Sequence, residues 1–118
     1  MKTEHKGIII PDYFIAMKWI GKGEKCMSDL HREIGIMYKH LHELKHTFID
    51  MNWIYIEKDN RKDIMYLTDY GKEIVVLINS LLKTMNMYDA DIKQYIEKGK
   101  LKKVVKVDIK QLKNEMNE

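Results

Sequence analysis

Residues 26–73, CMSDLHREIGIMYKHLHELKHTFIDMNWIYIEKDNRKDIMYLTDYGKE, decide the fold of this 118-residue chain. In the first part of the stretch, apolar residues recur three or four positions apart, which is the spacing of one helix face. This pattern predicts one helix over 27–34 and a second over about 38–51. Gly35 stands where the first helix needs a left-handed residue at its C-terminus, so we expect a tight turn between the two helices.

The second part of the stretch changes to a composition rich in β-branched and aromatic residues. Asn52 can take the left-handed conformation and end the preceding helix. The runs 53–56 and 64–67 then flank the polar segment 58–62, which predicts a β-hairpin. Thr68 is a good N-cap residue, so another helix is expected directly after the hairpin.

Helices are also expected on both sides of this stretch. Pro11 and Asp12 are suited to open a helix before it. After it, residues 86–91 are expected to break the chain before a short helix over 91–98. The Lys-rich tail over 100–118 fits either a strand or a helix, and its length favours a helix.

The composition is that of one small globular domain in a reducing compartment. Hydrophobic residues make up 45% of the chain and charged residues 33%, which excludes a disordered chain. The net charge of +3 permits a polyanionic partner without establishing one. Cys26 is the only cysteine, so no internal disulfide can form. We therefore expect a cytoplasmic protein with no membrane span and no cofactor.

Four short stretches of this region resemble the winged helix-turn-helix proteins of the MarR/PadR/ArsR kind. The family pattern reads T-V-S-E-L, G-I, G-L-I and L-T-x-x-G-x-E. In the same order this chain has CMSDL at 26–30, GI at 35–36, NWI at 52–54 and YLTDYGKE at 66–73. The chain departs from the pattern at three positions, where the family has a Ser or Thr helix cap, an apolar residue and a Gly: Met37, Lys45 and Asn52.

The resemblance implies both a fold and an activity. The fold is mainly α with a small β-hairpin wing (α+β). A winged helix-turn-helix DNA-binding domain would occupy 1–73, including an N-terminal arm, and C-terminal dimerisation helices would occupy 74–118 of the same compact unit. The implied activity is binding of double-stranded DNA as a homodimer, and not that of an enzyme.

The helix over 38–51 would enter the major groove, which admits one helix and is read from the helix N-terminal end. Its apolar stripe of Leu41, Leu44 and Phe48 faces the core. The side chains that point away from this stripe are therefore the candidates for DNA contact: Tyr38, Lys39, His42, Glu43 and His46, with His40 near the border. The alternative is an ordinary solvated helix face.

The two arginines stand out in a chain where 21 residues are Lys or Arg. Arg61 and the adjacent Lys62 belong to the hairpin tip. An Arg there can enter a narrow AT-rich minor groove, and similar proteins often carry a basic wing tip. Otherwise Arg61 is a plain turn residue. Arg32 could contact a phosphate or pair with Asp29 or Glu33.

One motif suggests a different activity. The segment 42–46 reads His-Glu-Leu-Lys-His, which matches the H-E-x-x-H signature of zinc metalloproteases. His42 and His46 would share a helix face as metal ligands, with Glu43 as general base. Charged Lys45 within the motif and the short chain argue against a protease. A regulatory metal site that uses His42, His46 and His40 is an alternative.

The helix after Thr68 is expected to bury its broad apolar face partly against a second copy of the chain. The residues expected at this dimer surface are Leu77, Leu81, Leu82 and Met85. The alternative is an intramolecular core that the tail completes. A dimer would bind two half-sites about one helical turn apart.

The function that these patterns favour is a sequence-specific transcriptional regulator, in particular a repressor, on the nucleoid. The alternatives are a phage or plasmid partition protein with the same fold, a winged-helix module for protein–protein contact, and the zinc hydrolase. The sequence does not specify the operator, the regulated gene or a small-molecule effector.

Overall fold

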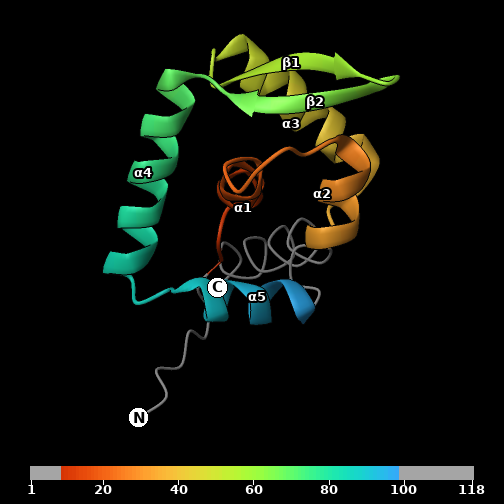
Figure 1. The fold of residues 1–118 in the computed structure, drawn as a ribbon. Coiled ribbons are helices and arrows are strands. Elements are labelled where there is room, and N and C mark those ends of the chain that lie inside the picture. Colours follow the sequence, from red (N-terminus) through yellow and green to blue (C-terminus); the bar gives the residue numbers. More distant parts are fainter. Residues whose placement is uncertain (1–8, 99–118) are drawn as a thin grey trace, which may run out of the picture.

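The computed structural model of the chain describes residues 9–98, which form five α-helices and one two-stranded antiparallel sheet (Figure 1). In chain order the elements are α1 (Asp12–Ile20), α2 (Met27–Ile34), α3 (Tyr38–Asp50), β1 (Ile54–Asp59), β2 (Lys62–Leu67), α4 (Asp69–Thr84) and α5 (Asp89–Glu97). The expected fold class, mainly α with a small hairpin, is confirmed. The expected N-terminal arm and the tail over 100–118 lie outside the described residues.

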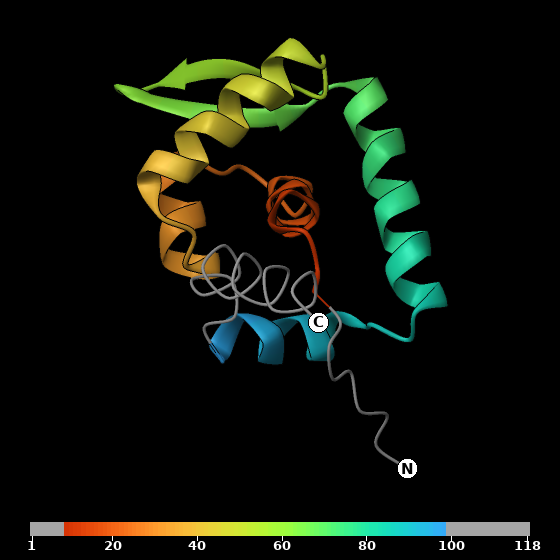
Figure 2. The ribbon, with the colours of Figure 1, turned by 180° about the vertical axis from the view of Figure 1, so that it is seen from behind.

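Helix α1 lies at the centre of the molecule because most of its side chains are apolar. Ile15, Ala16 and Met17 are all 0% exposed. Figures 1 and 2 show α4 on one side of α1, α2 and α3 on the other, the hairpin across one end and α5 across the other. Lys18 of α1 reaches Asp89 at 3.3 Å. Its hydrogen bond and charge lower the pKa of the Asp89 carboxyl.

The turn between α2 and α3 has the predicted geometry. Gly35 is left-handed, with φ of 77°, and its N–H donates to the His31 carbonyl at 3.0 Å. Helix α3 begins at Tyr38. Met37, its N-cap residue, makes no capping hydrogen bond with its side chain, as the departure from the family pattern indicates. The helix is followed by Asn52, which is left-handed as expected, with φ of 60°.

The hairpin has longer strands and a shorter turn than the sequence predicts. Asp59 pairs with Lys62, so only Asn60 and Arg61 form the turn, with φ of 49° and 72°. Two successive left-handed residues are typical of a type I′ turn, whose twist matches that of the strands. Lys25 extends the sheet by a single bridge, because its carbonyl accepts from the Met65 N–H at 2.8 Å.

The start of α4 is in close contact with the start of the hairpin. The Thr68 hydroxyl accepts from the Gly71 N–H at 2.9 Å and donates to the Asn52 carbonyl at 2.6 Å. The Thr68 N–H donates to the Trp53 carbonyl at 3.0 Å. A Cβ at Gly71 would lie only 1.9 Å from that Trp53 oxygen. The Thr-x-x-Gly pattern therefore lets the backbone of α4 approach the backbone before β1.

Two helix starts differ from the expectation. The N-cap residue of α1 is Pro11, and Asp12 lies in the first helical turn. Helix α5 begins at Asp89, inside the segment that was expected to break the chain. The cause is Asp91, whose carboxylate accepts from the Tyr88 N–H at 2.9 Å and so caps the helix from its third residue.

Candidate nucleic-acid interface

The outer face of α3 is polar and open. Leu41 and Phe48 point into the core, at 1% and 2% exposed, and Leu44 packs beside them. All five residues expected on this face from the sequence are exposed: Tyr38, Lys39, His42, Glu43 and His46. Figure 2 shows α3 on the outside of the molecule, where it runs across the hairpin. This face offers hydrogen-bond donors and acceptors and a lysine to a partner.

His40 is an exception, because it is half-buried and turned toward α1. Its Nε2 contacts the Asp12 carboxylate of α1, and its Nδ1 lies 3.5 Å from the Glu43 carboxylate. A partner on the outer face would meet Glu43 before His40. The main contact of His40 therefore holds α3 against α1, a role that the sequence pattern did not indicate.

Lys45 is a second residue whose role the sequence did not indicate. It occupies a usually apolar position, and its side chain is only 14% exposed. Its ammonium group lies 3.9 Å from the Asp63 carboxylate of β2. The contact ties α3 to the hairpin. An isolated charge at an apolar position was the available signal, but nothing local in the sequence pairs it with Asp63.

The hairpin tip presents Arg61 and Lys62, both exposed. Both views of the molecule place this tip on the side of α2 and of the start of α3, opposite to α4 (Figures 1 and 2). The hairpin tip and the start of α3, both predicted to contact DNA, therefore lie on the same side of the molecule.

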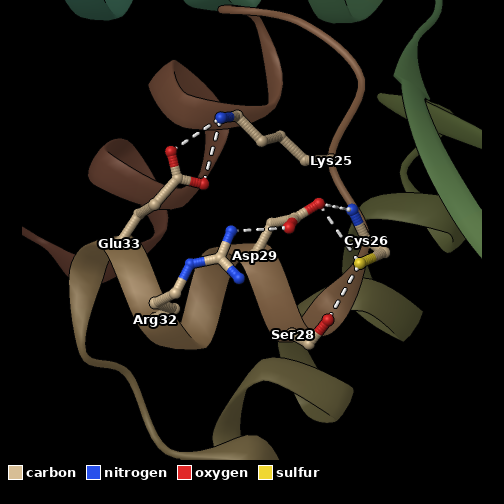
Figure 3. A network of polar contacts seen from close by, with 6 residues as sticks. All are labelled: Lys25, Cys26, Ser28, Asp29, Arg32 and Glu33. Atoms are coloured by element: carbon tan, nitrogen blue, oxygen red, sulfur yellow. Dashed lines mark hydrogen bonds and ion pairs between the residues drawn. The ribbon is translucent and has the colours of Figure 1, made fainter.

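Helix α2 and the two residues before it carry a network of polar contacts (Figure 3). The Asp29 carboxylate accepts from the Cys26 N–H and from Arg32, each at 3.0 Å. Lys25 donates to both oxygens of Glu33, at 2.8 and 3.0 Å. Of the alternatives for Arg32, pairing with Asp29 is observed. The Arg32 side chain is still 72% exposed, so contact with a phosphate stays open to it.

Asp29→Asn is expected to lower the free energy of unfolding by about 1 kcal/mol near pH 7, because the Cys26 N–H loses a charged acceptor. The hydrogen bonds from Cys26 and the nearby Arg32 hold the pKa of the Asp29 carboxyl below its ordinary 3.8. A group with a depressed pKa stabilises fully above its unfolded value, and this stabilisation is lost as the pH falls through the folded value. Urea unfolding of wild type and variant should therefore converge below pH 3.8.

Asp69→Asn is the matched control for this effect. Asp69 also lies in the first turn of a helix, but its side chain is fully exposed. We expect a smaller change from it. A difference between wild type and Asp29→Asn that stays constant into acid would contradict the role given to the Asp29 carboxylate.

The zinc-protease signature lies on the open face of α3. His42 and His46 are both exposed, one helical turn apart, with Glu43 between them. Within residues 9–98, no three His, Cys, Asp or Glu side chains are grouped so that they could hold a metal ion. The described fold therefore brings no third ligand to this pair. The described residues also form no such group from His40, His42 and His46, the alternative metal site.

Helix α4 carries exposed apolar residues along one flank. This α4 stripe consists of Tyr70 (47% exposed), Leu77 (64%), Leu81 (47%) and Met85 (37%). Leu82 was also expected at this surface, but it is 2% exposed and packs in the core of its own protomer. One position along a helix turns the side chain by about 100°. That rotation directs Leu82 inward and Leu81 outward.

The order α2, tight turn, α3, hairpin and α4, packed around α1, is that of a winged helix-turn-helix, with β1 and β2 as the wing. No helix of residues 9–98 is long and apolar enough to cross a membrane. No family model matches the chain. No curated protein matches it in sequence.

Solved structures do match the chain. The adhesin competence repressor AdcR from Streptococcus pyogenes aligns with a TM-score of 0.60 and 14% identity, over 96% of this chain and 86% of that one. A MepR mutant from S. aureus aligns with a TM-score of 0.58 and 14% identity, over 93% and 80%. A MarR family protein from Bacillus stearothermophilus aligns with a TM-score of 0.54 and 16% identity, over 93% and 76%. The chain therefore has the winged-helix fold of MarR-type proteins.

Proposed function

We propose that this chain binds double-stranded DNA in a sequence-specific manner, as a homodimer, and represses transcription. The observation that carries the proposal is the placement of two exposed polar regions on one side of the fold: the start of α3 and the wing tip. The similar AdcR structure is that of a protein named a repressor, which supports the regulatory part of the proposal. Such a protein would act on the nucleoid in the cytoplasm.

Helix α3 would lie in the major groove, where its N-terminal residues reach base edges. Lys39 can reach a guanine or a phosphate, and Glu43 can accept from a cytosine amino group. The wing would follow the duplex to the adjacent minor groove. There the guanidinium of Arg61 can enter a narrow AT-rich segment, where the negative potential is enhanced.

The dimer would form through the α4 stripe. Four large apolar side chains on one helix flank are exposed in the single protomer, and a symmetric partner would cover them. In Figure 1 the wing tip lies on the opposite side of the protomer from α4. A dimer formed at α4 would therefore direct its two wings outward, as two separate half-sites require.

Arg61→Gly is expected to weaken binding to an AT-rich duplex about tenfold without a loss of stability. Arg61 is left-handed, with φ of 72°, a conformation that costs an L-residue about 1–2 kcal/mol and glycine almost nothing. Glycine therefore suits the turn at least as well, and only the contact with DNA is removed. Fluorescence anisotropy over a salt series measures the affinity. The slope of log affinity against log salt concentration should become shallower by about the amount that one phosphate contact contributes. Urea unfolding measures the stability.

Lys93→Gln is the charge-matched control, because Lys93 is an exposed residue of α5, at the end of the molecule opposite the hairpin. If it weakens binding as much as Arg61→Gly, net charge is responsible and the wing is not at the DNA. Failure of the wild-type chain to bind any duplex at low salt would refute the proposed function. A search for protein partners would then be the next step.

A further inference from the structure

We infer that His31 is a positioning residue that holds Tyr38 in place for contact with DNA. The inference rests on the proposed function. His31 belongs to α2, and Tyr38 is the first residue of α3. Their rings are stacked, with centroids 4.3 Å apart and planes 25° apart. This is a direct side-chain contact between the two helices at the end of α3 that reads base edges.

The His31 ring is itself held by the turn. Its Nδ1 lies 2.8 Å from the Ile36 carbonyl oxygen. A carbonyl oxygen can only accept, so Nδ1 carries the proton and donates it. The backbone carbonyl of His31 also accepts from the Gly35 N–H, at 3.0 Å. His31 therefore bonds to the turn through both its side chain and its backbone carbonyl. These bonds hold the imidazole ring in place, so that a second ring can stack on it.

The residue that precedes Tyr38 gives its side chain no support. Met37, the N-cap residue, provides no side-chain hydrogen bond to the helix and is 67% exposed. Tyr38 itself is 44% exposed, so its ring is free on one side and stacked on the other. A side chain already ordered in the free protein loses less conformational entropy when it binds. The stack would thus present the Tyr38 hydroxyl to a base edge or a phosphate before DNA arrives.

The test is a double-mutant cycle measured by anisotropy on one duplex. His31→Ala is expected to weaken binding about threefold to tenfold, the effect of one unrestrained side chain. Tyr38→Ala should weaken it at least as much. In the double variant the two effects should not multiply, because His31 acts only through Tyr38. Independent effects that multiply, or an unaffected Tyr38→Ala, would overturn the inference.

Two further variants separate stacking from closure of the turn. His31→Phe keeps an aromatic ring and loses the hydrogen bond to Ile36, and we expect its affinity to stay within about twofold of wild type. His31→Gln keeps an amide donor and loses the ring, and it should bind as weakly as His31→Ala. The opposite order, with Gln tolerated and Phe not, would show that the hydrogen bond matters and would overturn the positioning role.

Stability and the proposed function are checked on the same proteins. Urea unfolding shows which variants are folded at the temperature of the binding assay, and the Phe and Gln pair carries the test if His31→Ala is not. A wild-type chain that binds no duplex would refute the proposed function together with this inference. A wild type that binds, with His31 and Tyr38 acting independently, would refute the inference alone.

Discussion

Gly71→Ala should lower the free energy of unfolding by about 3–5 kcal/mol, at the upper end for a single substitution. In an ordinary helix interior the same change is stabilising by about 1 kcal/mol, because alanine has the higher helix propensity. Here the added Cβ would lie 1.9 Å from the Trp53 carbonyl oxygen and 2.9 Å from the carbonyl carbon. Both atoms are backbone, so α4 must shift away from the hairpin to relieve the clash.

That shift would also break the contacts next to Gly71. The Thr68 N–H donates to the same Trp53 oxygen, and the Thr68 hydroxyl links Gly71 to Asn52. Urea unfolding followed by circular dichroism, at one protein concentration, measures the effect. Gly21→Ala is the matched control, because its Cβ would lie 3.2 Å from the flexible end of Leu67 and at ordinary contact distances, 3.4 and 3.5 Å, from the Lys18 and Met17 carbonyl oxygens. A Gly71→Ala protein as stable as Gly21→Ala would contradict the close approach seen here.

The double substitution Leu77→Glu and Leu81→Glu is expected to convert the proposed dimer to a monomer and to weaken the proposed DNA binding at least about 100-fold. Two carboxylates buried without partners in an apolar interface each cost several kcal/mol. A monomer then binds one half-site and loses the gain in affinity from two linked sites, about 10²–10⁴-fold. Both leucines are exposed, at 64% and 47%, so the protomer itself should stay folded.

Analytical ultracentrifugation gives the oligomeric state, and anisotropy on a palindromic duplex gives the affinity. Lys83→Glu is the control, since replacing a lysine by a glutamate lowers the net charge as much as the two Leu→Glu changes do, but on the polar flank of α4. Leu82→Glu should instead unfold the protomer, because Leu82 is 2% exposed and a carboxylate there would be buried in the core. A wild-type chain that is monomeric at every concentration would show that the proposed dimer does not form.

The expectations that the structure confirms depend on residues close together in sequence. The order of the elements, the left-handed Gly35 and the Thr68 cap can each be predicted from a few neighbouring positions. The outer face of α3 could also be predicted, because a period of 3.6 residues separates its polar side chains from Leu41 and Phe48. The strand ends differ from the prediction, because Lys58 and Lys62 are residue types typical of a turn and yet pair within the hairpin.

The order of the winged-helix elements and the polar side of α3 therefore follow from local sequence patterns. The packing of the helices determines which individual residues are exposed and which are held by distant partners: Leu81 points outward and Leu82 inward, His40 contacts Asp12, and Lys45 pairs with Asp63. It also placed the wing tip on the same side as the start of α3 (Figure 1). The difference arises from how far apart in the sequence the interacting residues lie. Helix and turn patterns reflect interactions within a few residues, whereas these contacts join segments 18 to 28 positions apart, whose approach depends on how the helices pack.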